Sequence, residues 1–198
     1  ILLFCAIGVY TVNNSAAAMT DGDVLCLLNN DTEVITPNWM EEMLGCLMQR
    51  GVGVVGARLL YPNNTVQHAG VILAGEDRIA AHAHAFIPGD DRGYVGRASV
   101  AQDFSAVTAA CMMIRRMVYM ELNGLDEENL AVAFNDVDFC LRTRQAGWRV
   151  VYTPYAELYH HESATRGGKR TAESKARMRR EAGHMRSKWG QLLLHDPF

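Results

Sequence analysis

The 198 residues are enough for one globular domain with a sizeable hydrophobic core. Nearly half of them are apolar and 21% are charged, an ordinary composition for a folded protein, and the net charge of −3 does not indicate a nucleic-acid partner. The five cysteines contain no CxxC pair, so they indicate reduced thiols in a cytosolic protein rather than a disulfide framework or a zinc site.

The chain opens on an apolar segment, residues 1–10, that is too short for a membrane span of about 20 residues. It has no initiator Met and no basic leader, so we interpret it as a buried strand of a chain truncated before it. The continuous apolar run at 24–28 predicts a second strand, buried on both faces of a parallel sheet.

A helix is predicted next, with Thr36 as its N-cap, Pro37 at its first position and Gly51 at its end. The strand that follows, at 52–57, overlaps a GxGxxG pattern at 51–56. A dinucleotide-binding fingerprint needs a strand before the glycines and a helix after them. Because the order here is the reverse, we reject that interpretation.

The second half of the chain is irregular at first, since residues 76–103 show no clear period and predict a long loop with a functional or mobile role. Around it, the patterns predict strands or extended segments at 71–74, 107–114, 149–154 and 156–160, and helices at 116–122 and 135–146. These elements together predict an α/β fold, with a mostly parallel central sheet flanked by helices and a mixed edge formed by the later strands.

Residues 163–191 carry nine Lys and Arg against two Glu, and they predict a loop followed by a basic helix at about 171–189. A solvated helical face is the ordinary explanation of such a charge pattern. Attraction to anionic lipid, at about 1 kcal/mol for each basic residue, is the alternative, so a peripheral association with a membrane stays open.

The first group of candidate site residues, Asn29, Asn30 and Asp31, directly follows the strand predicted at 24–28. In open α/β sheets ligands bind at the carboxyl ends of the strands, so Asp31 stands where a site is expected. A carboxylate there suits Mg²⁺ or Mn²⁺, which take few protein ligands and complete their shell with diphosphate oxygens and water. The alternative is an Asx turn.

Two carboxylates, Asp136 and Asp138, lie in the first turn of the helix that Asn135 is expected to cap. Acidic residues in a first turn also suit the helix dipole, and Asp138 occupies a capping-box-like position three residues after Asn135, which favours a structural role. Asp136 can instead project into a cleft and accept a proton from a sugar hydroxyl.

Histidines form the third group of candidates. His160 and His161 end the last predicted strand, and because adjacent strand residues point to opposite faces, at most one of them can face the site. We expect His161 to be a surface or hydrogen-bonded residue. His68, His82 and His84 lack the paired spacing of zinc ligands, and for His68 we expect an acceptor-side or structural role.

Together these motifs resemble those of the family 2 glycosyltransferases, in particular the enzymes of O-antigen and rhamnan-type polysaccharide assembly. The resemblance rests on LLNNDTEVITPNWMEEML at 27–44 and FNDVDFCLRTRQAGWRVVYTPYAELYHHESATRG at 134–167, and it extends over VQHAGVIL, TAACMMIRR and KWGQLLLHDPF. It implies a GT-A-like fold that lacks the first βαβ portion, and an inverting, metal-dependent sugar transfer.

The resemblance also implies a role for each matching residue. Asp31 ends a DxD-like motif and would bind Mn²⁺ or Mg²⁺ on the donor diphosphate, with His160, 24 residues after Asp136, as a further metal ligand. Asp136 would be the catalytic base. The remaining roles are donor contacts from Asn29, Asn30 and Arg166, the last in a loop at 163–168, and acceptor-side positions at His68, Thr108 and Asn135.

From these roles we expect a catalytic domain at 1–165 and a basic loop and helix at 166–198 packed on it. The expected partners are a UDP-, dTDP- or GDP-sugar donor and a saccharide or lipid-linked saccharide acceptor, in the cytoplasm or at the inner face of the membrane. The alternatives are a catalytically degenerate domain that binds carbohydrate or nucleotide, and a nucleotide-sugar hydrolase or epimerase.

Overall fold

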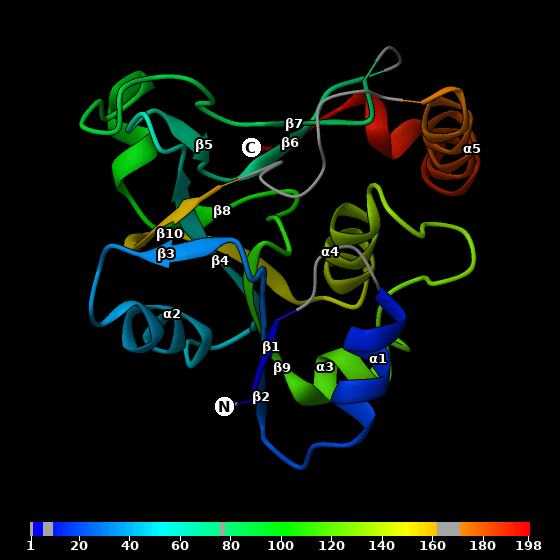
Figure 1. Cartoon of the computed structure of the whole chain (residues 1–198), viewed down its shortest axis with the longest axis horizontal. Helices are drawn as coiled ribbons and strands as arrows, with labels where there is room; N and C mark the ends of the chain where they lie inside the picture. The colour runs from blue at the N-terminus through cyan, green and yellow to red at the C-terminus, as the bar shows by residue number, and fades with distance from the viewer. Residues whose placement is uncertain (1, 6–9, 76–77, 162–170) are drawn as a thin grey trace.

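The computed structural model describes residues 2–5, 10–75, 78–161 and 171–198, which form a central sheet with helices on both faces (Figure 1). The main sheet has eight strands in these residues, in the order β1-β2-β9-β4-β10-β3, with β5 paired to β4 and β8 paired to β10. The strands are β1 (Leu2–Cys5), β2 (Val24–Leu28), β3 (Thr32–Val34), β4 (Val52–Leu60), β5 (Val66–His68), β8 (Gln102–Asp103), β9 (Cys111–Arg115) and β10 (Arg149–His160). A separate hairpin pairs β6 (Val71–Leu73) with β7 (Ala80–His82).

The helices form layers on the two sides of the sheet. They are α1 (Tyr10–Ala18), α2 (Trp39–Leu47), α3 (Arg116–Glu121), α4 (Asn135–Gln145) and α5 (Ala172–Trp189), with 3₁₀ turns η1 (Tyr94–Ser99) and η2 (Gly190–Leu194). Figure 1 shows α2 on one side of the strands and α1, α3 and α4 on the other. The α2 face and the α4 face each bury their own apolar cluster.

The alternation of side chains along β2 explains why both faces need a cover. Leu25 and Leu27 belong to the cluster under α4, whereas Val24 and Cys26 belong to the cluster under α2. This is the period of two that a strand imposes on its side chains. Burying a Leu side chain contributes about 1.5–3 kcal/mol, so a strand that is apolar on both faces is stable only between two layers of helices.

The α/β architecture with a helix-flanked sheet is confirmed, but the expectation of a mostly parallel sheet is wrong. In the main sheet two strand pairs are parallel, β1 with β2 and β4 with β10, and the other five pairs among its described strands are antiparallel. The mixed part is not an edge, because β9 lies between β2 and β4 and runs opposite to both.

Several predicted boundaries also move. The helix expected at Thr36 and Pro37 begins at Trp39, after Asn38, which makes no side-chain capping bond. Asn135 is the first helical residue of α4 rather than its cap, since the capping position is held by Phe134 in a left-handed conformation. The two extended segments predicted at 149–154 and 156–160 are one strand, β10, whose register with β4 shifts between Thr153 and Glu157.

Two other segments differ from their predictions. Residues 76–103 are not a single irregular loop, because β7, η1 and β8 occur within them. Residues 52–56 of the GxGxxG pattern lie in the β4 strand. No helix opens on the glycines in this described segment, as expected when the pattern is not a dinucleotide fingerprint. There the missing side chain of Gly56 leaves room for Val107, with which an added Cβ would overlap.

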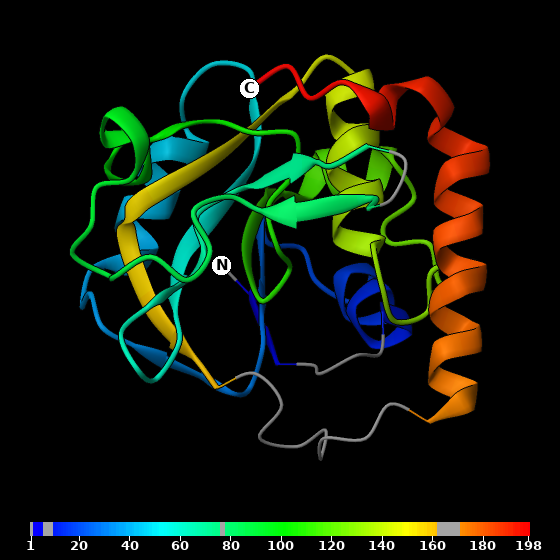
Figure 2. The ribbon, with the colours of Figure 1, turned by 90° about the horizontal axis from the view of Figure 1, so that it is seen from above.

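The basic helix α5 is anchored to α4 by its last turn. Lys188 Nζ lies 2.7 Å from the buried Asp138 Oδ1, and Trp189 Nε1 donates to the same oxygen at 2.9 Å. At the other end, the Thr171 side chain accepts a hydrogen bond from the backbone N–H of Ser174, as an N-cap should. Figure 2 shows α5 along one flank of the molecule, beside α4. No helix within the described residues is long and apolar enough to cross a membrane.

Candidate functional site

The structure brings the first and third groups of predicted site residues together at the carboxyl ends of β2 and β10. His160 Nε2 lies 3.2 Å from Asp31 Oδ1 and 3.1 Å from Asn29 Nδ2. The pairing of β10 with β3 sets this approach, because His160 stands opposite Thr32, the residue after Asp31. Asp31, Asn29 and His160 therefore form one cluster, although 129 residues separate Asp31 from His160 in the sequence.

The second nitrogen of the His160 ring meets a residue for which the sequence suggested no role. His160 Nδ1 lies 2.7 Å from Oε1 of Gln67, a buried residue of β5. Gln67 is part of the VQHAGVIL motif that carries the family resemblance, and its place next to His68 is the only signal that could have found it. The His160 ring is thus held between Gln67 on one side and Asn29 and Asp31 on the other.

The cluster fits a divalent cation by its geometry and by its donors. Asp31 Oδ1 is buried and accepts no hydrogen bond from the described part of the chain. Ligands about 2.1 Å from an octahedral ion and at right angles to each other are about 3 Å apart, close to the 3.2 Å between Asp31 Oδ1 and His160 Nε2. Among the described residues no group of three His, Cys, Asp or Glu side chains assembles here.

Asp136 lies at the start of α4 and is held by two backbone N–H groups. Its Oδ2 accepts from Ala109 at 3.2 Å and its Oδ1 from Val137 at 2.9 Å. The side chain is only partly buried, and each carboxylate oxygen has a second lone-pair direction for another donor. Asp136 is thus oriented by the main chain and still able to accept a proton.

The segment 108–110 connects Asp136 to the Asp31 cluster. The N–H of Ala109 binds Asp136, and the carbonyl of the next residue, Ala110, accepts a hydrogen bond from the backbone N–H of Asn29 at 2.9 Å. Asp136 and Asn29 therefore approach neighbouring residues of one short backbone segment. Asp136 and the Asp31–His160 pair thus lie at the same edge of the sheet.

The acceptor-side candidates His68 and Thr108 are also in contact. The N–H of Thr108 donates to His68 Nε2 at 3.4 Å, and His68 Nδ1 lies 2.9 Å from Nδ1 of His82. The sequence did not predict this histidine pair, because β6 and β7 bring His82 back over β5. Burial lowers the pKa of His68 well below its usual value, and the neighbouring His82 and His160 lower it further.

Two polar residues at the start of α4, Asn135 and Asp138, form buried contacts within the protein. Asn135 is fully buried, donates to the carbonyls of Asp126 and Leu130, and accepts from the N–H of Asp126. Asp138 is fully buried too, and its contacts with Arg142, Lys188 and Trp189 support the structural role expected of it, although not through a capping box. The acceptor-side role of Asn135 stays a prediction, and its contacts favour an indirect one, through the loop at 126–130.

The remaining candidates are two residues whose side chains face solvent and one that the structure does not describe. Asn30 is exposed. His161 lies at the surface as expected, with Nε2 3.2 Å from Glu33 Oε2. Arg166 and the loop at 163–168 lie outside the described residues.

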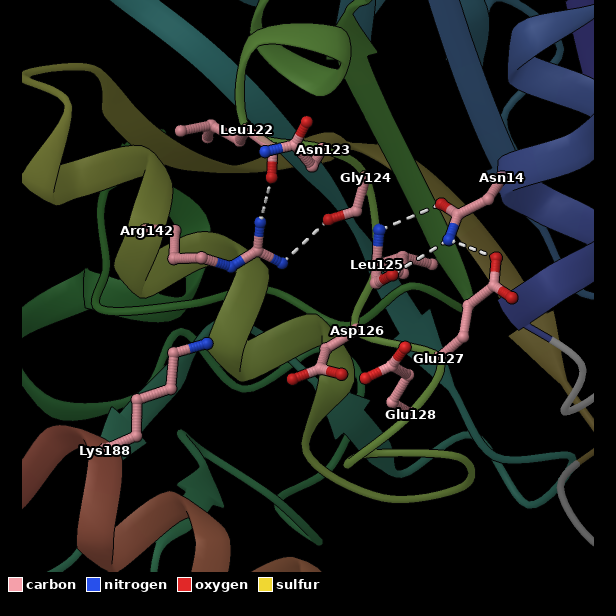
Figure 3. A pocket seen from close by; sticks show the side chains of 10 residues that line it. All are labelled: Asn14, Leu122, Asn123, Gly124, Leu125, Asp126, Glu127, Glu128, Arg142 and Lys188. Atoms are coloured by element: carbon pink, nitrogen blue, oxygen red, sulfur yellow. Dashed lines mark hydrogen bonds between the residues drawn. The ribbon is translucent and has the colours of Figure 1, made fainter.

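A cavity of about 480 Å³ lies between α1, α4, α5 and the 122–128 loop, away from the Asp31 cluster (Figure 3). Its polar groups mostly hold the loop in place, since Arg142 donates to the carbonyls of Leu122 and Gly124, and Asn14 bonds to Leu125 and Glu127. None of the predicted site residues lines it.

The fold and the site define the class of protein. The structure of GalNAc-T7 with UDP, GalNAc and Mn2+ is similar to this chain with a TM-score of 0.58 at 15% identity, over 78% of this chain and 30% of that one. The mannosyltransferase PcManGT from Pyrobaculum calidifontis, in complex with GDP-Man and Mn2+, has a TM-score of 0.56 at 12% identity, over 91% and 43%. The fold is that of the GT-A glycosyltransferases.

The chain belongs to the glycosyltransferase-like family 2, whose family model matches residues 9–184. Among curated relatives, an uncharacterised protein of Sinorhizobium fredii, y4gI, is 47% identical over 94% of this chain and 20% of its own length. The O-antigen biosynthesis protein RfbC of Myxococcus xanthus is 40% identical over 78% of this chain and 12% of its own. The chain thus spans a fifth or less of the length of these two relatives.

Proposed function

We propose that the protein transfers a sugar from a nucleoside-diphosphate donor to a saccharide acceptor, with inversion at the anomeric carbon, in the assembly of a cell-surface polysaccharide. The observation that carries the proposal is the arrangement around segment 108–110, with Asp136 on one side and the Asp31–His160 pair on the other. Support comes from the family, from the O-antigen relative, and from the nucleotides and Mn2+ named for the two similar structures.

Asp136 would act as the base. Its carboxylate takes the proton of an acceptor hydroxyl, whose oxygen forms the new bond to the anomeric carbon while the bond to the diphosphate oxygen breaks and its electron pair leaves with the diphosphate. The backbone N–H groups of Ala109 and Val137 keep the carboxylate aimed during this step. A single base acting on the face opposite the leaving group implies inversion.

Asp31 and His160 would hold a divalent cation, Mn²⁺ or Mg²⁺, whose charge would neutralise the negative charge that grows on the departing nucleoside diphosphate. The chain's own part is to present a carboxylate oxygen and an imidazole nitrogen together at the edge of the sheet. Asn29, whose amide contacts His160, and Asn30 would contact the donor from the same loop.

The metal and donor assignments can be tested by binding. We expect UDP, dTDP or GDP to bind in an Mn²⁺-dependent manner by isothermal titration calorimetry, and Asp31→Ala to remove the dependence on Mn²⁺. The matched control is Glu33→Ala, which removes an exposed carboxylate two residues away that forms an ion pair with the surface His161. If Asp31→Ala and Glu33→Ala bind the nucleotide equally well, both with and without Mn²⁺, the metal assignment is contradicted.

Product analysis separates the remaining alternatives. Incubation with nucleotide-sugars should give a sugar–acceptor product only when an acceptor saccharide is present. Release of free sugar without an acceptor would indicate a hydrolase, and a changed donor sugar would indicate an epimerase. Tight nucleotide binding without any product would indicate a degenerate binding domain.

We further propose that the enzyme works in the cytoplasm, at the inner face of the membrane, on a lipid-linked acceptor. A relative named N-acetylglucosaminyl-diphospho-decaprenol L-rhamnosyltransferase, from Mycobacterium tuberculosis, is 34% identical over 31% of this chain and 20% of its own length. Helix α5 exposes the basic residues Lys175, Arg179, Arg180 and Arg186, which suit an anionic lipid surface.

A further inference from the structure

Gln67 makes two contacts with His160, one to its backbone and one to its ring. The Gln67 amide nitrogen Nε2 donates to the carbonyl oxygen of His160 at 3.4 Å, and the amide oxygen Oε1 lies 2.7 Å from His160 Nδ1. Both residues are at least nine-tenths buried, at 4% and 8% exposure. Gln67 lies on the Nδ1 side of the His160 ring, opposite Asp31.

The backbone of β5 directs Gln67 toward His160. In the pairing of β5 with β4, Val66 stands opposite Leu60 and His68 opposite Leu59, so Gln67 is the extra residue of a β-bulge. A bulge changes the direction of a side chain relative to regular pairing. Gln67 therefore points at β10, although the side chains on both sides of it are buried as well.

The two contacts fix which ring nitrogen of His160 carries the proton. A backbone carbonyl can only accept, so the end of the Gln67 amide that faces it must be the NH₂ group. The other end, which faces His160 Nδ1, is then the carbonyl oxygen, also an acceptor. Nδ1 must therefore be the protonated nitrogen, and in the neutral ring Nε2 carries the lone pair.

We propose that Gln67 is a positioning residue that keeps the proton of His160 on Nδ1, so that Nε2 is presented beside Asp31 as a metal ligand. Without the Gln67 oxygen, Nδ1–H would lose its acceptor, and the Asp31 carboxylate 3.2 Å from Nε2 would favour Nε2–H, against the Asn29 amide nitrogen that lies 3.1 Å from Nε2 and favours a lone pair there. The Nε2–H tautomer has no lone pair to offer a cation at Nε2. The inference rests on the metal site of the proposed function, but the tautomer itself can be measured without a metal.

The first experiment measures the tautomer in the metal-free protein. The ¹⁵N shifts of the two ring nitrogens, recorded about two pH units above the ordinary histidine pKa of about 6.5, distinguish a protonated from an unprotonated nitrogen. We expect Nδ1–H for His160 in the unsubstituted protein and a shift toward Nε2–H in Gln67→Met, which keeps the length of the side chain but offers no acceptor. An Nε2–H ring in the unsubstituted protein would overturn the inference.

The second experiment measures Mn²⁺ affinity by electron paramagnetic resonance with UDP, dTDP or GDP present, which supplies the diphosphate oxygens but no sugar to transfer, so there is no turnover. Loss of a hydrogen-bond partner behind a histidine ligand typically weakens metal binding about 10–100-fold, which is the loss we expect for Gln67→Met. Gln67→Glu should bind Mn²⁺ within a few-fold of the unsubstituted protein, because either form of the carboxyl offers Nδ1–H an acceptor. Tyr159→Phe, which removes a contact of the neighbouring residue with Asn64, is the matched control.

The outcomes separate the inference from the function on which it rests. If the unsubstituted protein binds no Mn²⁺ with the nucleoside diphosphate present, the proposed metal site is wrong whatever Gln67 does. If it binds Mn²⁺ and Gln67→Met binds equally well, the metal site stands and the role of Gln67 is wrong. Equal loss in Gln67→Met and Gln67→Glu would show that packing, not the acceptor, matters, and would also overturn the inference.

Discussion

The attachment of α5 through Asp138 can be tested by replacing that carboxylate with its isosteric amide, Asp138→Asn. Asp138 is fully buried, its Oδ2 accepts from Arg142 Nε at 2.8 Å, and its Oδ1 receives Lys188 at 2.7 Å and Trp189 at 2.9 Å. Removing one partner of a buried ion pair costs about 3–5 kcal/mol. Because Arg142 and Lys188 keep 17% and 32% of their side chains exposed, we expect the lower end, about 3 kcal/mol.

The assay is urea unfolding combined with hydrogen exchange. For a domain of this size, a loss of about 3 kcal/mol in the free energy of unfolding would also lower the melting temperature by about 6–12 °C. In the hydrogen-exchange measurement, the amides of α5 should exchange faster than those of β4. The control Lys188→Met removes one partly exposed partner and should cost about 1 kcal/mol or less. A loss below about 1 kcal/mol in Asp138→Asn, or a loss equal to that of Lys188→Met, would refute the idea that the buried carboxylate carries the attachment.

Three further predictions follow from the site and the surface. Asp136→Asn should lower kcat about 10²–10⁴-fold with donor binding unchanged by calorimetry, and retained turnover would remove Asp136 from the mechanism. Burial holds the pKa of His68 below its value in the unfolded chain, so the unfolded state binds the proton first as the pH falls below about 6.5. The free energy of unfolding therefore decreases below that pH. Urea titrations should show a shallower decrease in His68→Gln. Replacing Lys175 and Arg179 by Gln should reduce the fraction of the protein that sediments with anionic vesicles. If α5 is only a solvated helix face, the unsubstituted protein should not sediment with these vesicles at any salt concentration.

The elements that follow local rules could be predicted from the sequence, and those set by distant contacts could not. The apolar run of β2 was found at its exact bounds, and α3, α4 and α5 were found within a residue or two at each end. The place of β9 between β2 and β4, rather than at a mixed edge, was missed, because hydrophobic periodicity says nothing about which strands become neighbours. The helix α1 was missed as well, since Asn13, Asn14 and Ser15 are weak helix formers.

For the site, the sequence named most of the side chains but not their connections. The DxD-like and Asn-Asp motifs and the spacing to His160 identified residues that the structure places at one edge of the sheet. Gln67 carried no signal beyond its place next to His68, because its importance depends on a bulge in β5 and on the ring of a residue 93 positions away. The backbone groups of Ala109 and Ala110 could not be predicted from residue types, since any residue supplies the same N–H and C=O.

The antiparallel strand β9, whose central place was missed from the sequence, is what allows the site to form. Strands β2, β4 and β10 run the same way, so Asp31 and His160 leave at a common edge. A parallel strand between β2 and β4 would enter the sheet at the opposite edge. Because β9 is antiparallel, its first residue, Cys111, pairs with Leu28 at the end of β2, and the preceding segment 108–110 crosses the edge where the ligands gather. The N–H of Ala109 can then hold Asp136 beside the strand ends, so the antiparallel strand β9 brings the proposed base to the proposed metal ligands.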